Sequence, residues 1–181
     1  LDAQPYTSPQ AVEKALDALR VLRKNTFSVS KKAVVVPYGE VLSEVVDKCP
    51  RNMVCVVCKR MMLRIAEAIA LREGAWAVVT GDILGEQASQ TLQNLFAIDS
   101  AATKLPVLRP LIGFNKSEVE ELARRIGTYE VSAREEPPCR AAPKRPRTKA
   151  SPEEALEAEK DLDAEGLVRE AVEQATCVSL D

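Results

Sequence analysis

Histidine is absent from this sequence of 181 residues. Its absence excludes catalytic triads built on histidine, imidazole general bases and histidine-ligated zinc. Any metal ligands must therefore be cysteine thiolates or carboxylates.

The sequence also lacks a signal peptide, an apolar run long enough to span a membrane and a strong net charge. The formal net charge is −2, so any nucleic-acid-binding surface must be local. Five cysteines is an odd number, which argues against a secreted disulfide scaffold and favours the reducing cytoplasm. The first residue is Leu rather than Met, so we expect an upstream region.

What is present is an alternation of apolar strands and amphipathic helices. We expect four helices in this part of the chain. The first opens at Ser8-Pro9, the second and third span 52–72 and 86–97, and the fourth follows Asn115. The segments expected to be strands are 33–36, which we predict to be buried on both faces, 75–80 and 105–112. This alternation predicts an α/β fold with a parallel sheet and helices on both of its faces.

The composition changes after Tyr129 and divides the chain into three predicted parts. Residues 1–133 form the α/β part. Residues 134–150 are basic and proline-rich, which predicts an extended segment. Residues 151–181 begin with the helix-capping pattern Ser151-Pro152 and are predicted to form an acidic helical tail.

Cys55 and Cys58 lie three residues apart near the start of the long predicted helix. They share one helix face, where the helix dipole favours the thiolate. The pair is compatible with a redox site, with half of a metal site, or with simple core packing, because Cys58 also falls in the apolar stripe.

A polar loop follows the strand 75–80. It contains Gly81, Asp82, Gln87, Ser89 and Gln90. Parallel α/β folds bind ligands where strands end, so the loop is a candidate ligand site. The alternative is an ordinary strand-to-helix turn.

The third candidate is Cys139 in the basic segment. Flanking proline and arginine predict an accessible thiol with a stabilised thiolate. Lys144, Arg145, Arg147 and Lys149 follow, and their charges suit phosphate contacts with a nucleic acid. The alternative is a solvated linker.

Five segments together carry a family resemblance: PYTS at Pro5, CVVCKRMMLRIAEAIA, TGDILGEQASQTLQNL, LPVLRPLIGFNKSEVEELARRIGTYE and PKRPRTK. They resemble the catalytic domain of the ThiI family, the tRNA 4-thiouridine synthetases that are also tied to thiamine biosynthesis. The resemblance implies a PP-loop ATPase fold of the adenine nucleotide alpha hydrolase-like type.

The resemblance also implies an activity. Family members adenylate a tRNA uridine with ATP and then replace the activated oxygen with sulfur, and some supply sulfur for the thiamine thiazole. By resemblance, Lys59, Gly81 and Gln90 belong to the site for ATP with Mg²⁺. Cys139 matches the catalytic sulfur-relay cysteine. The implied partners are tRNA and a sulfur donor, either sulfide or a cysteine desulfurase; a homodimer is left open.

In relatives without a rhodanese domain, Cys55, Cys58 and Cys139 match a three-cysteine iron–sulfur site. The competing interpretation is a disulfide relay between Cys139 and the pair. Either way, we expect the three sulfurs to converge beside the loop 81–90. Cys49 and Cys177 match no family role and are interpreted as structural.

The chain departs from the family by lacking the SGG-x-DS phosphate-binding loop. The first two strands, the first helix and the RNA-binding THUMP domain of the family are also absent, which leaves the fold incomplete at its N-terminus. The missing strands would lie between 33–36 and 75–80, so we expect a gap there, filled by an N-terminal region or by another chain. The alternative function is a non-catalytic tRNA- or metal-binding half-domain beside a separate ATPase chain.

Overall fold

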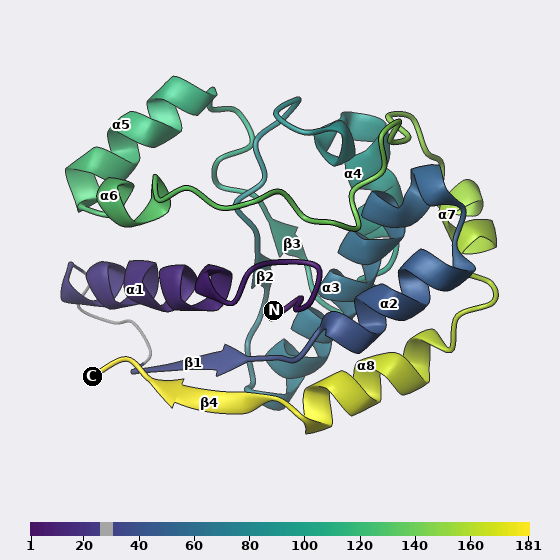
Figure 1. The fold of residues 1–181 in the computed structure, drawn as a ribbon, viewed down its shortest axis with the longest axis horizontal. Helices are drawn as coiled ribbons and strands as arrows, with labels where there is room; N and C mark the ends of the chain where they lie inside the picture. Colours follow the sequence, from purple (N-terminus) through teal and green to yellow (C-terminus); the bar gives the residue numbers. More distant parts are fainter. Residues whose placement is uncertain (26–30) are drawn as a thin grey trace.

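The computed structural model describes residues 1–25 and 31–181 (Figure 1). In chain order its elements are α1 Gln10–Lys24, β1 Lys32–Val35, α2 Gly39–Lys48, η1 Arg51–Met53, α3 Val54–Arg72, β2 Val78–Val79, η2 Ala88–Gln90, α4 Leu92–Asp99, β3 Val107–Leu108, α5 Lys116–Ile126, α6 Tyr129–Ser132, α7 Pro152–Ala158, α8 Ala164–Glu173 and β4 Thr176–Ser179. The α/β prediction is confirmed.

Local signals placed several helices correctly. α5 begins with a capping box between Asn115 and Glu118, and it ends at Gly127, whose φ of 81° is the left-handed conformation that glycine favours. α7 begins with a second capping box, between Ser151 and Glu154. The predicted helix 86–97 is instead the short turn η2 followed by α4, which Thr91 caps.

The strands form two separate pairs. β2 and β3 are parallel, with Val78 opposite Val107. β1 pairs antiparallel with β4, with Val34 opposite Cys177. The prediction of a wholly helical tail is therefore wrong for β4, and the tail covers one edge of β1. β2 and β3 are also shorter than the predicted strands.

An apolar groove of about 350 Å³ lies between β1 and β2, over one side of α3. Its lining residues are Leu1, Val34, Val36, Ile65, Ala66, Ile69, Ala70, Ala77 and Val78. β1 is only half-buried along this groove, so the prediction of burial on both faces is wrong for residues 33–35. Within the described residues β1 and β2 form no hydrogen-bonded pair. This arrangement matches the gap expected between the strands at 33–36 and 75–80.

The start of the chain runs alongside the end of β1. Asp2 forms a parallel bridge with Pro37: the Asp2 N–H donates to the Val36 carbonyl at 2.8 Å, and the Tyr38 N–H donates to the Asp2 carbonyl at 2.7 Å. A strand continuing backwards from Leu1 would therefore lie parallel to β1 and enter the groove.

Helix α3 is the centre of the core. It contacts α2, α4, α7, α8 and β2, and its residues Val57, Met61 and Ile65 have no exposed surface. Figure 1 shows α8 running beneath it and β4 running beneath β1, so the C-terminal tail belongs to the same packed body. α2, which supplies buried Val41 and Val45, was not predicted.

None of the helices in the described ranges is both long and apolar enough to cross a membrane.

Candidate functional site

The carboxyl ends of β2 and β3 bring polar residues together around Asp82. Its Oδ1 accepts hydrogen bonds from Lys59 Nζ at 2.8 Å and Gln90 Nε2 at 3.1 Å. Its Oδ2 accepts from Thr80 Oγ1 at 2.7 Å and Arg109 Nε at 3.2 Å. We call these five residues the Asp82 cluster. It unites three elements that are far apart in sequence: α3, the loop after β2 and the end of β3.

The Asp82 carboxylate is held in its charged form. Burial alone would raise its pKa, but hydrogen bonds from Lys59, Thr80 and Gln90 outweigh burial and hold the pKa well below its usual range. Arg109 is held in turn by Asp99, whose two oxygens lie 2.5 and 2.9 Å from the guanidinium. Gly81 leaves open space beside the backbone, because a Cβ there would meet nothing within 4 Å.

One polar atom in the cluster has no partner. Gln90 is only 8% exposed, and its Nε2 is bonded to Asp82. Its Oε1 is buried and accepts no hydrogen bond. An unsatisfied buried acceptor costs about 1–3 kcal/mol, so it marks a place where a ligand with a hydrogen-bond donor would be stabilised.

Cys55 and Cys58 lie on the first turns of α3, Cys55 one turn before Lys59 of this cluster and Cys58 directly before it. Burial raises the pKa of Cys55, and it raises the pKa of Cys58 to about 11. The expected stabilisation of thiolate by the helix dipole is therefore outweighed by desolvation. Tyr38, which is fully buried, donates its hydroxyl hydrogen to the Cys58 carbonyl at 2.8 Å and lies 3.4 Å from Cys58 Sγ.

Cys139 lies close enough to the pair for their charges to interact, because its charge raises the pKa of both Cys55 and Cys58. It is half-buried against the core rather than freely accessible. All five cysteines are free thiols. Within residues 1–25 and 31–181, no three metal-ligating side chains are close enough to hold a metal ion.

Lys59 joins the two groups. Its ammonium pairs with Asp82 and also lowers the pKa of both Cys55 and Cys58. The residues predicted for nucleotide binding, Lys59, Gly81 and Gln90, therefore lie together, and the predicted thiols lie beside them.

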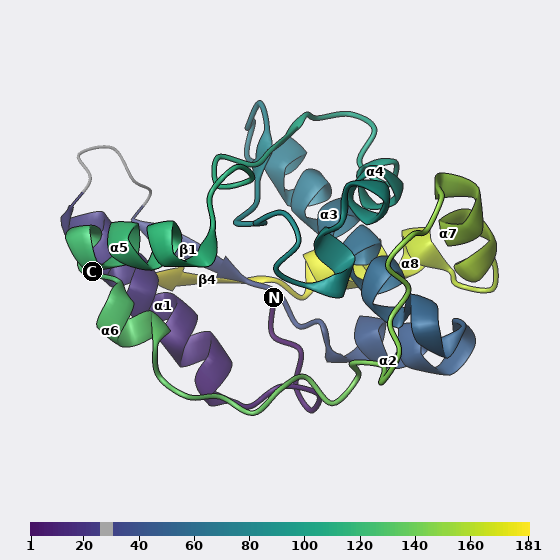
Figure 2. The same cartoon turned by 90° about the horizontal axis from the view of Figure 1, so that it is seen from above.

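The basic segment 134–150 is extended, as predicted, and runs from α6 across to α7 (Figures 1 and 2). Asn94, which is fully buried, clamps it: Nδ2 donates to the Arg147 carbonyl at 2.8 Å, and Oδ1 accepts from the Ala150 N–H at 2.9 Å. Nearer Cys139, the Arg140 N–H donates to the Tyr6 carbonyl at 2.9 Å. The segment is thus a fixed strap and not a solvated linker.

The four predicted nucleic-acid residues differ in their surroundings. Lys144, Arg145 and Lys149 are exposed and form no ion pair within the described part of the chain. Arg147 pairs with Glu154 and donates to the Lys149 carbonyl at 3.1 Å. Three of the four side chains are therefore available to a phosphate backbone.

The sequence did not single out Arg109, Asn94 or Tyr38. Arg109 and Asn94 stand inside the quoted motifs LRPLIG and QTLQNL, but their partners are distant in sequence. Cys49 is buried, and burial raises its pKa to about 11, which agrees with a structural role. Cys177 is exposed on β4 and does not pack in the core.

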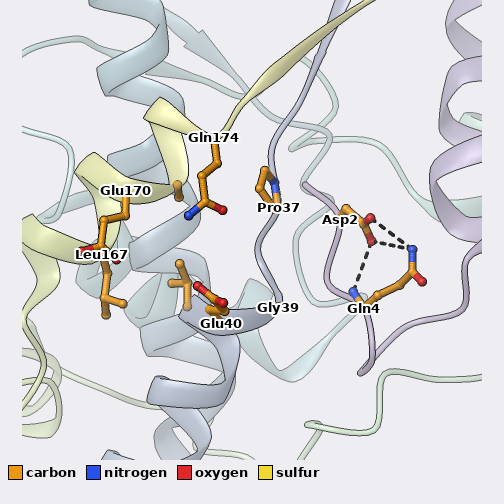
Figure 3. A pocket seen from close by; sticks show the side chains of 10 residues that line it. Asp2, Gln4, Pro37, Gly39, Glu40, Leu167, Glu170 and Gln174 are labelled. Atoms are coloured by element: carbon orange, nitrogen blue, oxygen red, sulfur yellow. Dashed lines mark hydrogen bonds between the residues drawn. The ribbon is translucent and has the colours of Figure 1, made fainter.

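A separate cavity of about 190 Å³ lies between α8 and the start of α2 (Figure 3). Glu40 and Glu170 line it, while Asp2 turns its carboxylate toward Gln4. None of the predicted site residues borders this cavity, so the candidate site remains the Asp82 cluster and the neighbouring thiols.

Comparison with known proteins agrees with this arrangement. The family described as "Thiamine biosynthesis protein (ThiI)" matches residues 1–164. The chain belongs to the ThiI family. It is similar to a probable tRNA sulfurtransferase of Methanosarcina mazei, with 38% identity over 99% of this chain and 44% of the relative. Another of that description, from Caldanaerobacter subterraneus subsp. tengcongensis, is 41% identical over 88% of this chain and 42% of the relative.

A solved structure has the same fold. It is described as a 4-thiouridine synthetase–RNA complex with bound ATP, and it matches 99% of this ThiI-family chain with a TM-score of 0.92 and 38% identity. The match covers 47% of that structure's chain. The present chain spans less than half the length of the relatives it matches.

Proposed function

We propose that this chain supplies part of the catalytic domain of a tRNA sulfurtransferase that makes 4-thiouridine with ATP. The observation that carries the proposal is the Asp82 cluster, with its unsatisfied Gln90 acceptor, placed beside three thiols at the carboxyl edge of β2 and β3. The matched 4-thiouridine synthetase, solved with RNA and ATP, supports the same assignment.

The division of labour follows from the geometry. Lys59, Gly81 and Gln90 lie together and would hold the nucleotide, whose Mg²⁺ would accompany the phosphates. The uridine O4 attacks the α-phosphorus of ATP and releases pyrophosphate, giving an adenylated uridine. A sulfur nucleophile carried by Cys139 then adds to C4, and AMP leaves with the original oxygen.

For the relay the sulfur donor is a cysteine desulfurase, whose own persulfide passes its outer sulfur to the Cys139 thiolate and is left as a thiol. Sulfide would be the donor only for a cluster, where iron would bind it without a change of oxidation state. The reducing cytoplasm is the compartment that suits five free thiols. The same sulfur carrier would serve the thiamine thiazole. The exposed residues Lys144, Arg145 and Lys149 would contact tRNA phosphates, on the strap that also carries Cys139.

The groove between β1 and β2 is the place where further strands would complete the sheet. It is apolar, it lies over α3, and Asp2 already runs parallel to the end of β1. We assign to this groove the first two strands of the family fold, from an N-terminal region or from a chain that supplies it. RNA binding by a THUMP domain would come from the same source.

The thiols support two routes for sulfur. In a disulfide relay, Cys139 carries a persulfide whose outer sulfur bonds to C4 as AMP leaves. Cys55 or Cys58 then attacks Cys139 Sγ and breaks the bond between Sγ and that outer sulfur, which releases the thiouridine and leaves a cysteine disulfide that a dithiol reductant reopens. An iron–sulfur cluster on Cys55, Cys58 and Cys139 is the second candidate, because the three thiols lie near enough for their charges to interact. The thiols as arranged do not form a metal site, so they would have to move to bind a cluster.

The deciding experiment is Cys139→Ser in the complete protein. We expect thiouridine formation to be abolished while ATP-dependent adenylation of tRNA continues, because the thiol and the nucleotide cluster are separate groups. Cys177→Ser, at an exposed thiol of β4, is the control and should keep both activities. Loss of both activities in the Cys139 variant would assign it a structural role, and iron content with the visible spectrum of anaerobic protein would separate cluster from relay.

The alternative function is a non-catalytic half-domain that presents tRNA or a metal to a separate ATPase chain. The exposed basic strap favours it, since contacts with Asn94 within this chain hold the strap in place. Mass measurement of the native protein decides: a chain containing the SGG-x-DS loop supports the enzyme, and a chain lacking it supports the half-domain.

A further inference from the structure

The unpartnered oxygen of Gln90 has a fixed orientation. A glutamine amide has a donor end and an acceptor end. The donor end, Nε2, faces Asp82 Oδ1 at 3.1 Å. Asp82 also accepts hydrogen bonds from Lys59, Thr80 and Arg109. Because an ionised carboxylate has no hydrogen to donate, it cannot form a hydrogen bond with the oxygen of the Gln90 amide.

We propose that Asp82 locks the Gln90 amide so that the nucleotide site accepts a hydrogen-bond donor of the nucleoside and rejects an acceptor in that position. This inference rests on the proposed function, in which ATP binds at this edge. ATP offers two kinds of donor, the 6-amino group of adenine and a ribose hydroxyl. An acceptor placed there would face Oε1 with no hydrogen between the two oxygens.

Asp82 acts here as a positioning residue, since its contacts are with protein donors. Both of its oxygens are already used, and it is only 9% exposed. Its pKa lies well below the usual range, so the carboxylate stays ionised and remains an acceptor at physiological pH. The selectivity is therefore built into a residue that need not touch the nucleotide.

The test measures the affinity of ATP and three analogues for the complete protein by calorimetry. Inosine triphosphate replaces the 6-amino group by an oxygen, while 2′-deoxy-ATP and 3′-deoxy-ATP each lack one hydroxyl. We expect one analogue to bind roughly tenfold to hundredfold more weakly than ATP, which is the loss expected when a buried acceptor keeps no partner. Weakening of the inosine compound assigns the amino group, and weakening of a deoxy compound assigns the ribose.

Variants show whether Asp82 sets this preference. In Asp82→Asn the partner amide can donate or accept, Gln90 can turn over, and the preference should fall to about threefold or less. Asp99→Asn is the control, because Asp99 binds Arg109 but does not contact Gln90. This variant should keep the preference for ATP over the analogue. Gln90→Met should abolish the preference, and it tests the role of the Gln90 amide even if Asp82→Asn does not fold. A preference that persists in Gln90→Met would contradict the inference.

Other results would also overturn the inference. ATP binding with equal affinities for all analogues, or a preference that survives in Asp82→Asn, contradicts the amide lock but leaves the proposed function intact. Absence of any ATP binding by the complete protein overturns the proposed function and the lock with it.

Discussion

Two neighbouring residues of α3, Lys59 and Arg60, reach two different buried carboxylates. Lys59 binds Asp82 at the edge of the parallel pair. Arg60 binds both oxygens of Glu159 at 2.9 and 3.0 Å, and Arg64 reinforces them. Both carboxylates are anchored by cations of the same helix. Burial raises the pKa of each carboxylate, but hydrogen bonds outweigh this effect, so that the pKa of each is lowered.

The two networks differ in completeness. Around Glu159, Nη1 of Arg60 donates to the Ala97 carbonyl and to Ser100 Oγ, so α3, α4 and the end of α7 are tied together. Around Asp82, Gln90 keeps a buried acceptor without a partner. The satisfied network around Glu159 holds elements of the fold together, whereas the unsatisfied acceptor beside Asp82 is what the proposed ligand would complete.

The largest effect is expected from Glu159→Gln. Arg60 has no exposed surface, so removing the negative charge leaves a buried cation without a counter-charge. We expect the free energy of unfolding to fall by about 3–5 kcal/mol, measured by urea denaturation. Asp82→Asn should cost less, because Lys59 is 26% exposed and Arg109 keeps Asp99. Equal losses would erase the distinction between the two networks.

Nucleotide should stabilise the protein through one network only. At a concentration one hundred times its Kd, ATP is expected to raise the unfolding free energy of the complete protein by about 2.7 kcal/mol. Gln90→Met should reduce this gain by weakening binding, whereas Glu159→Gln should keep the gain while lowering the baseline. Thermal shifts with and without ATP provide the measurement. A full gain in the Gln90 variant would contradict the assignment.

Acid should weaken both networks, since the pKa of each carboxylate is lower in the folded chain than in the unfolded one. Their stabilisation is present above the unfolded pKa of about 4 and is lost as the pH falls through the folded value. The unfolding free energy falls as the pH drops from 5 to 3, and we expect this fall to be smaller in Glu159→Gln. The difference should be about 1 kcal/mol for each unit by which folding lowers the pKa of Glu159. Urea midpoints across this range check it, and an unchanged slope would mean that Glu159 is not coupled to folding.

The smallest effect is expected from the basic residues of the strap, where exposed cations can be compared with one that is already paired. Replacing Lys144, Arg145 or Lys149 by Ala should flatten the dependence of log tRNA affinity on log salt by about 0.7–0.9 for each lost phosphate contact. Arg147→Ala should change this slope less, because Arg147 already pairs with Glu154. Filter binding at several salt concentrations distinguishes them. A slope that stays unchanged after all four residues are replaced by Ala would assign the strap to solubility.

The sequence predicted what short-range chemistry decides. The capping box of Asn115 and Glu118 lies within four residues, and it formed as expected. β4 was missed because its pairing with β1 joins residues far apart in the chain, and no local signal in 176–179 announces a partner. The site follows the same rule: Gln90 and Lys59 came from motifs, but only the fold shows that Asp82 connects them.

The thiols illustrate the limit most clearly. The position of Cys55 and Cys58 on one helix face was readable from their spacing, but their acidity was not. Helix position favours thiolate, yet the neighbours that bury Cys58 come from the rest of the fold, including Tyr38 before α2. Burial is a tertiary property, so the direction of the pKa shift could not be predicted from the helix alone.

Asn94 holds the strap through main-chain atoms: it contacts the carbonyls of residues 88 and 147 and the N–H of residue 150. Every amino acid except proline offers the same two groups, so the path of the strap places little demand on which side chains it carries. Replacing the exposed Lys144, Arg145 or Lys149 should therefore change the charge of the strap without changing its path, whereas Arg147 also contacts Glu154 and the Lys149 carbonyl. Anchoring and recognition are thus encoded separately, and one can evolve without disturbing the other.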